Sequence, residues 1–229
     1  MPMYLLAIET SSESCSAALS CAGELLTRAE HAPRQHARMI LPMIDAVLAE
    51  AGISMSQVDA FAYGHGPGAF TGVRIGAGLA MGLADGSAKP LFGVSCLQAL
   101  ALQAQRRSEI QTAVLACTDA RMGEVYWGWF AEGADQPGRE EVCQPQLLMQ
   151  ESLTPLALIG DGAARYADLQ PLLQAAQWQD LTAMPLAEDI ARLAQQRWQV
   201  GERPQPVNQQ PVYLRDRVAD PSARVHSGT

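Results

Sequence analysis

A glycine-rich segment constrains the fold of this chain more than any other feature of its sequence. It reads Gly64-His-Gly-Pro-Gly-Ala-Phe-Thr-Gly-Val-Arg-Ile-Gly76. The apolar residues 58–63 before it predict a strand, and residues 71–85 after it predict a helix. Glycines at such a junction let the backbone approach an anion, and a helix N-terminus offers free N–H groups. The segment lacks Walker-loop and GxGxxG spacing, so close packing or an interface is the favoured interpretation, with ligand binding as the alternative.

Strands and helices alternate along the rest of the chain. The apolar stripe of residues 35–51, followed by Gly52, predicts a capped amphipathic helix, and Ser95 is placed to cap another. Further strands are predicted at residues 4–8, 16–20, 24–29, 90–94, 112–118, 124–129 and 156–159, and a last helix at 187–200. Hairpins followed by strand–helix alternation predict an α/β fold with mixed sheets.

Charge and proline content predict how the chain divides. The charged residues 106–109 predict a boundary between an N-terminal lobe, residues 1–105, and a C-terminal lobe, residues 106–215. Prolines at positions 204, 206 and 211 break regular structure and predict an extended arm. We expect residues 216–229 to form a flexible tail.

Composition excludes several classes of protein. With 48% hydrophobic and 17% charged residues, the 229-residue chain can bury a core and is not a disordered chain. A net charge of −8 disfavours broad binding to nucleic-acid phosphates, and the lone lysine, Lys89, excludes a lysine-dependent phosphate loop elsewhere. Five scattered cysteines without CxxC spacing predict reduced thiols in a cytoplasmic protein. We expect neither a secretory signal nor a membrane span.

Three turns could hold parts of a nucleotide. Glu9-Thr10-Ser11-Ser12 follows the first strand, as does the first phosphate loop of actin-like ATPases, where an aspartate is usual. The turn that begins at Asp119 could be a second phosphate loop, but it lacks a run of glycines and an ordinary β-turn is favoured. The turn Gly160-Asp161-Gly162 could receive an adenosine, although a Gly-Asp-Gly turn alone is not diagnostic of a nucleotide site. The candidate nucleotide site is Glu9, Thr10, Ser11, Asp119, Gly160 and Gly162.

The familiar catalytic motifs are missing from the sequence. The histidines, His31, His36, His65 and His226, form neither HExxH nor HxxxH, and none stands at ligand spacing from a cysteine. GxSxG is also absent, so the sequence offers no serine nucleophile of that type. We therefore expect no catalytic residue and no metal site in this chain.

Several segments together resemble the bacterial TsaB family, in the same order along the chain. The matching segments are residues 6–12, 36–45, 66–76, 93–95, 119–126 and 211–215, so the resemblance covers nearly the whole chain. It implies a two-lobed actin-like (ASKHA) fold. It also implies a role in placing the threonylcarbamoyl group on the adenosine beside the anticodon, in tRNAs that read codons beginning with A.

The resemblance also implies a non-catalytic subunit. TsaB proteins are paralogues of TsaD, which performs the transfer, and they work with TsaD and the ATPase TsaE. TsaD carries two metal-binding histidines in an HxxxH helix. The matching positions in this chain are Cys96 and Leu100. Leucine cannot ligate a metal, so the resemblance implies that the metal site is lost. Glu9 in place of aspartate and the glycine-poor turn at Asp119 make the nucleotide site vestigial. No cofactor is expected, apart from weak or interface-borne ATP or ADP.

Helices of the N-terminal lobe are the expected partner surface. In this family they form a bundle with the matching helices of TsaD, and the same surface pairs two copies into a homodimer, while tRNA is reached only through the complex. Small residues permit close helix approach and aliphatic side chains provide burial. The matching residues are Met39, Met43, Ile44, Val47, Arg74, Gly76, Leu79 and Met81, with burial inside the chain's own core as the alternative.

Three other functions stay open at this point. The first is a stand-alone ASKHA ATPase or kinase that uses Glu9, Thr10, Asp119 and the turn at residues 160–163. The second is a tRNA-binding module that uses the arginines of the C-terminal arm. The third is a metallopeptidase homologue, which the missing metal ligands disfavour.

Overall fold

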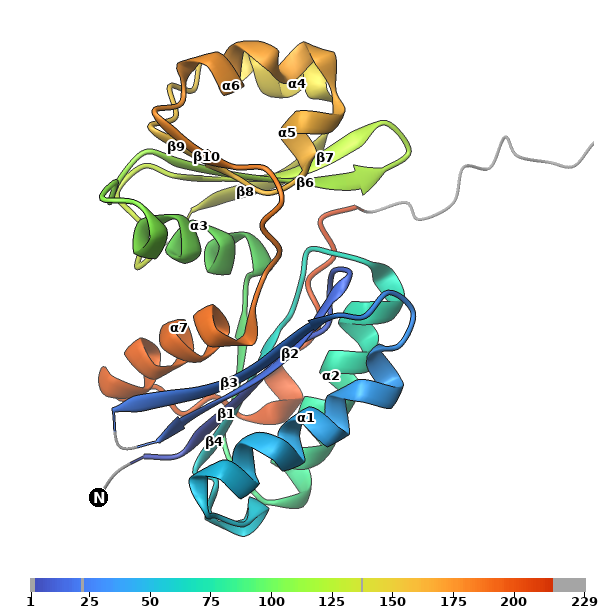
Figure 1. The fold of residues 1–229 in the computed structure, drawn as a ribbon, viewed down its shortest axis with the longest axis vertical. Coiled ribbons are helices and arrows are strands. Elements are labelled where there is room, and N and C mark those ends of the chain that lie inside the picture. Colours follow the sequence, from blue (N-terminus) through green and yellow to red (C-terminus); the bar gives the residue numbers. More distant parts are fainter. Residues whose placement is uncertain (1–2, 22, 137, 216–229) are drawn as a thin grey trace, which may run out of the picture.

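Two mixed five-stranded sheets, one in each lobe, form the framework of the protein (Figure 1). The computed structural model describes residues 3–21, 23–136 and 138–215, so the predicted tail at 216–229 lies outside the described residues. The first sheet has the order β3-β2-β1-β4-β5. Its strands are Leu5–Glu9 (β1), Ser14–Cys21 (β2), Glu24–His31 (β3), Ala60–Gly64 (β4) and Leu91–Val94 (β5).

The second sheet repeats the topology of the first, with the order β8-β7-β6-β9-β10. Its strands are Val114–Arg121 (β6), Glu124–Phe130 (β7), Arg139–Cys143 (β8), Ala157–Ile159 (β9) and Trp178–Asp180 (β10). In each sheet two consecutive hairpins supply three antiparallel strands, and two parallel strands extend the sheet beyond the first of them. The two halves therefore share their connectivity.

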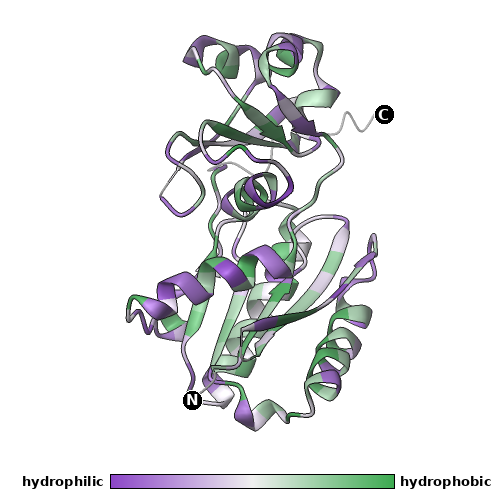
Figure 2. Ribbon diagram, turned by 60° about the vertical axis from the view of Figure 1, so that its left-hand side comes forward, coloured by the Kyte–Doolittle hydropathy of each residue, from purple (hydrophilic) through white to green (hydrophobic). Residues whose placement is uncertain are grey.

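Helices cover both faces of each sheet. The first sheet lies between the pair α1 (His36–Ala51) and α2 (Phe70–Gly86) and the single helix α7 (Ala187–Gln199). The second lies between α3 (Cys96–Arg107) and the short helices α4 (Pro145–Leu148), α5 (Gly162–Arg165) and α6 (Gln170–Ala175). Figure 2 shows hydrophobic residues along the central strands, which are covered on both sides. Among the described residues, no helix has the length and apolar content needed to cross a membrane.

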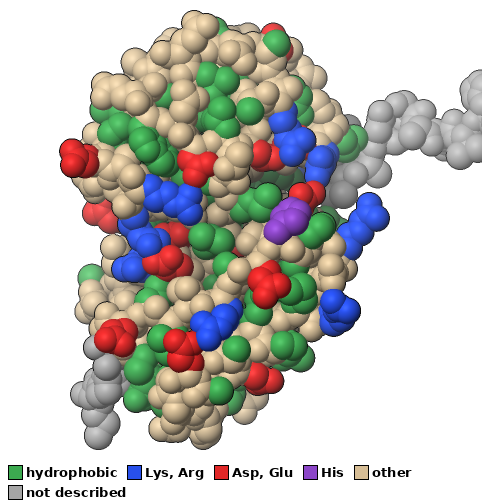
Figure 3. Space-filling view, viewed as in Figure 1, with side chains coloured by type: hydrophobic (Ala, Val, Ile, Leu, Met, Phe, Trp, Pro, Cys, Tyr) green, Lys and Arg blue, Asp and Glu red, His purple; other side chains and the backbone are tan. Residues whose placement is uncertain are grey.

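Helices α3 and α7 lie between the two sheets, and they correct the predicted division into lobes. Leu100 of α3, assigned by sequence to the N-terminal lobe, packs into the core of the second sheet. Ile190 of α7, assigned to the C-terminal lobe, packs against the first. A single boundary after residue 105 fails because α7 packs against first-sheet strands far earlier in the chain, whereas α3 already packs against β6, the strand that follows it. Arg106 on α3 forms ion pairs with Glu188 and Asp189 on α7, and Figure 3 shows acidic and basic side chains together along this junction.

The apolar stripe of α1, predicted as a partner surface, is largely core. Met43, Ile44 and Val47 have exposed fractions of 6%, 0% and 0% and pack against the first sheet. Gly76 on α2 is buried as well. The structure corrects the prediction for these four residues. Amphipathic spacing identifies a face that is buried, but it does not tell whether the chain's own sheet or a partner buries it.

Ile44→Ala should destabilise the fold strongly, because it removes a fully buried side chain and leaves a cavity against the first sheet. We expect the free energy of unfolding, measured by urea denaturation, to fall by about 2–5 kcal/mol. Leu41→Ala is the matched control: Leu41 lies on the same helix and is 50% exposed, so a change within about 0.5 kcal/mol is expected. Equally small effects at both positions would contradict the placement of Ile44 in the core.

Candidate functional site

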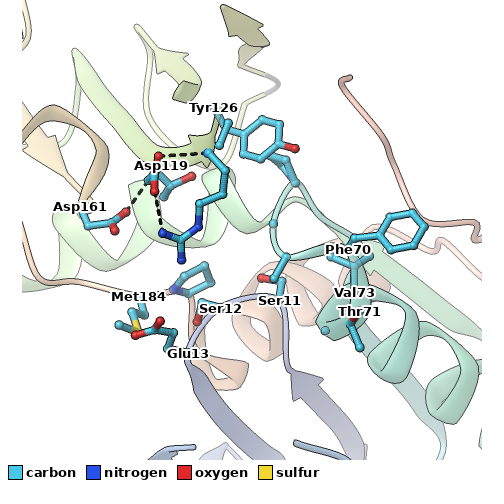
Figure 4. A pocket seen from close by; sticks show the side chains of 18 of the residues that line it. Ser11, Ser12, Glu13, Phe70, Thr71, Val73, Asp119, Tyr126, Asp161 and Met184 are labelled. Atoms are coloured by element: carbon cyan, nitrogen blue, oxygen red, sulfur yellow. Dashed lines mark hydrogen bonds and ion pairs between the residues drawn. The ribbon is translucent and has the colours of Figure 1, made fainter. Parts of the chain in front are cut away.

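A cleft of about 820 Å³ lies between the lobes (Figure 4). The first lobe contributes the β1–β2 loop and the N-terminal ends of α1 and α2, and the second contributes the β6–β7 turn and the start of α5. The segment before α7 and residues 212–215 complete the lining. In Figure 4, Ser11 and Ser12 lie across from Asp119 and Asp161. The two predicted phosphate turns therefore face each other across this cleft.

Glu9 at the end of β1 points into the protein and not into the cleft. Its side chain is fully buried, and one carboxyl oxygen accepts a hydrogen bond from the backbone N–H of Ser11. The other oxygen lies 3.3 Å from the thiol of Cys96, which donates to it. Burial raises the pKa of Glu9 above its ordinary value. Glu9 thus accepts a hydrogen bond from an N–H group of its own loop, the kind of group that contacts phosphate in a phosphate loop.

The glycines of α2 bring this helix against the same β1–β2 loop. The hydroxyl of Thr10 donates to the carbonyl of Gly72 at 2.8 Å, and the N–H of Ala69 donates to the carbonyl of Ser11 at 2.7 Å. A Cβ at Gly72 would collide with the carbonyl of Thr10, and one at Gly76 would lie 2.7 Å from the Thr10 hydroxyl. Close packing, the favoured interpretation of the glycine-rich segment, is what these contacts show.

The turn between β6 and β7 also satisfies its own polar groups. One carboxylate oxygen of Asp119 accepts hydrogen bonds from the N–H of Arg121 at 3.0 Å and the hydroxyl of Tyr166 at 2.9 Å. The N–H of Asp119 donates to the carboxylate of Asp161 at 3.1 Å. The guanidinium of Arg121 pairs with the second oxygen of Asp119 at 3.1 Å. The carboxylate and the N–H of Asp119 therefore both have partners within the protein.

The third predicted turn serves packing. A Cβ at Gly160 would lie 2.5 Å from the carbonyl oxygen of Cys117, and one at Gly162 would lie 2.7 Å from the backbone of Thr118. Only glycine therefore lets this turn approach β6. Of the six residues predicted for a nucleotide, Ser11 and Asp119 line the cleft, whereas Glu9, Thr10, Gly160 and Gly162 do not.

The two positions that match the metal ligands of TsaD lie in the interior. Cys96 and Leu100 on α3 are 1% and 0% exposed, and Leu100 packs into the core of the second sheet. Burial, together with the nearby carboxyl of Glu9, raises the pKa of the Cys96 thiol well above its ordinary value, so the thiol stays protonated. No cluster of three or more histidine, cysteine or acidic side chains suited to a metal ion occurs in residues 3–21, 23–136 and 138–215.

Two parts of the cleft were not assigned to a site from the sequence. Arg34 and His36, at the start of α1, are among the residues that line it. Residues 212–215 form another wall, and Arg215 reaches the β6–β7 turn. For this cleft, the resemblance gave a signal for His36 and for residues 211–215, which lie in matching segments, and none for Arg34.

Comparison with known proteins agrees with this geometry. The family model "TsaD: tRNA N6-adenosine threonylcarbamoyltransferase" matches residues 28–203. The tRNA threonylcarbamoyladenosine biosynthesis protein TsaB of Escherichia coli is 39% identical over 95% of this chain and 96% of its own length. The protein of the same description from Haemophilus influenzae is 37% identical, over 94% and 95%. The chain belongs to the TsaB family.

Solved structures support the TsaB assignment and the fold. YeaZ from Pseudomonas aeruginosa superimposes with a TM-score of 0.82 at 38% identity, over 93% of this chain and all of that one. The predicted two-lobed actin-like fold, with a mixed sheet in each lobe, is confirmed. In this TsaB protein, the β1–β2 loop and the β6–β7 turn of that fold direct their hydrogen bonds to the protein itself.

Ser95, at the crossing from β5 to α3, contacts a half-buried acid on β8 whose ionisation depends on folding. Ser95 caps α3 by accepting hydrogen bonds from the N–H groups of Leu97 and Gln98, at 3.1 and 3.2 Å, as predicted. Its hydroxyl donates to the carboxyl of Glu140 on β8 at 2.5 Å. Burial raises the pKa of Glu140 to about 7.

Glu140→Gln should flatten the pH dependence of stability. The unfolded chain releases the Glu140 proton near pH 4.5, whereas the folded protein keeps it to about pH 7. Stability should therefore fall as pH rises through this window, by about 3 kcal/mol for this group, and glutamine should remove that part of the fall. Urea denaturation at pH 5 and pH 7.5 measures it. Glu141→Gln, which alters a surface partner of Arg139, should leave the fall intact; equal slopes in wild type and Glu140→Gln would refute the assignment.

Proposed function

We propose that this protein is a non-catalytic subunit needed to form threonylcarbamoyladenosine beside the anticodon, in tRNAs that read codons beginning with A. It would act as docking scaffold and activator for TsaD, together with TsaE. The observation that carries the proposal is the inward-turned Glu9, which binds the N–H of Ser11 and the thiol of Cys96. The loop at Ser11 corresponds to the phosphate loop of an active paralogue, and Cys96 corresponds to one of its metal ligands.

The proposed docking face is the outer surface of α1 and α2. It consists of Ala37, Leu41 and Asp45 on α1 and of Arg74, Gly78 and Gly82 on α2, all of which are exposed. A Cβ at Gly78 or Gly82 would meet nothing within 4 Å. These two glycines leave the helix surface open, so another helix can approach closely. The remaining predicted interface residues, Met39, Leu79 and Met81, are half-buried and pack against the core beneath this face.

Charge on these helices supports pairing of the same face with a second copy when TsaD is absent. Arginines lie near the N-terminal ends, Arg38 on α1 and Arg74 on α2, and aspartates lie further along, Asp45 and Asp85. An antiparallel arrangement of two copies would set each arginine end against an aspartate end. With a net charge of −8, the chain is better suited to reach tRNA through a complex than alone.

Gly78→Leu should abolish binding to TsaD without harming the fold. The new side chain would enter open space on the docking face, and replacing a mid-helix glycine should raise the free energy of unfolding by about 1 kcal/mol. Co-purification with tagged TsaD gives the binding readout and urea denaturation gives stability. Gln196→Leu is the matched control, because it adds the same side chain to an exposed position of α7. Retained TsaD binding by folded Gly78→Leu would refute the docking face.

The proposal assigns no cofactor to the isolated chain. The N–H of Ser11 is taken by Glu9, and the N–H of Asp119 by Asp161, so a bound phosphate would have to break these hydrogen bonds. We therefore expect calorimetry with ATP and magnesium to show no tight binding and no hydrolysis by this chain alone. Tight binding with hydrolysis would instead favour a stand-alone ATPase, and nucleotide bound only in the presence of TsaD would place it at the assembled interface.

A further inference from the structure

Residues 211–215, here called the strap, connect the two lobes beside the cleft. In Figure 1 the strap belongs to the red segment that rises from the first lobe toward the second sheet. Helices α3 and α7 lie on the other side of that view and make the contact between the lobes there. The strap is therefore a second tie between the lobes, and residues 212–215 form one wall of the cleft.

One end of the strap is held by the loop that precedes α2. The N–H of Val212 donates to the carbonyl of His65 at 2.8 Å. Gly66 has a φ of +106°, and a Cβ there would lie 2.8 Å from the carbonyl oxygen of Val212. Glycine is therefore required at position 66 both for the backbone conformation and for the approach of the strap.

Tyr213 extends this anchor onto the first turn of α2. Its hydroxyl accepts a hydrogen bond from Nε of Arg74 at 3.0 Å. The guanidinium of Arg74 lies 3.6 Å above the ring centre of Phe70, and the rings of Phe70 and Tyr213 are 6.0 Å apart. Cation–π and aromatic contacts of this kind add to the hydrogen bond. Tyr213 thus fixes the strap to two residues of α2, Arg74 and Phe70.

Arg215 is the anchor on the second lobe, and its side chain is only 17% exposed. Its guanidinium donates to the carbonyl oxygens of Ala120 and Arg121, at 3.1 and 3.4 Å, and pairs with the carboxylate of Glu124. Arg121 and Met122 have φ values of 63° and 55°, a left-handed conformation that is unfavourable for side chains of this size. One terminal nitrogen of the guanidinium makes all of these contacts, so a single cationic group holds both the backbone of the turn and the carboxylate of Glu124.

We propose that the strap is a clasp that holds the cleft closed, with Tyr213 anchoring it to the first lobe and Arg215 to the second. While both anchors hold, the β6–β7 turn stays opposite the β1–β2 loop. When either is released, the lobes can rotate about the contact between α3 and α7, and the cleft widens. The clasp is made by contacts within this chain and needs no partner, although its anchor Arg74 also belongs to the docking face.

Single-molecule fluorescence transfer between the lobes tests the clasp at concentrations too low for self-association. Cys21→Ser and Cys143→Ser first remove the two partly exposed thiols. Glu30→Cys on β3 and Gln174→Cys on α6, both at exposed positions, then supply the sites for the dyes. Arg215→Gln should give lower and more broadly distributed transfer than the parent protein. Tyr213→Phe, which loses only the hydroxyl bonded to Arg74, should give a smaller change in the same direction.

Arg203→Gln is the matched control. Arg203 also belongs to the C-terminal arm, but it stacks on Trp198 at 3.3 Å and donates to the backbone of Trp198 and Glu202, all on the first-lobe side. This variant should keep the parental transfer distribution. An unchanged distribution in folded Arg215→Gln would overturn the clasp. If that variant does not fold, Glu124→Gln weakens the same anchor from the other side, and parental transfer in it would overturn the clasp equally.

Discussion

The rest of the structure depends on the close contact between α2 and the β1–β2 loop. Gly72 and Gly76 let the helix backbone reach Thr10, whose hydroxyl bonds to the carbonyl of Gly72 at 2.8 Å. The contact fills the space beside the loop, while Glu9 takes the N–H of Ser11 from within. The same helix then has its outer surface, with Gly78 and Gly82, free for another chain. One packing arrangement thus holds α2 against the β1–β2 loop and leaves the opposite side of the helix open.

The sequence predicted the elements whose ends carry a clear signal. α1 ends at Gly52, which has a φ of 67°, and Ser95 caps α3, both as expected. β8, β10, α4 and α6 were not predicted, because short segments show too little periodicity to stand out from loops. Nor could spacing reveal that α3 and α7 exchange lobes. α7 meets strands of the first sheet, which lie far away along the chain, and α3 packs with the second sheet although it directly follows β5; neither is visible in local spacing.

The candidate site shows the same limit at the level of single residues. The sequence located both turns that face the cleft, but it could not tell that Glu9 turns inward to Cys96 while Ser11 faces the cleft. For Met43 and Val47, apolar spacing was compatible with core and with interface, and burial decides for core. The contacts of Arg215 were beyond any local pattern, because its partners lie more than 90 residues earlier in the chain.

The central claim is that this chain enables a reaction that it cannot itself perform. Reconstituted modification of tRNA, with TsaD, TsaE, ATP and a threonylcarbamoyl donor, tests it directly when this chain is included or omitted. We predict threonylcarbamoyladenosine only when TsaD and this chain are both present, and none when this chain replaces TsaD. Full modification without this chain, or modification by this chain without TsaD, would contradict the account.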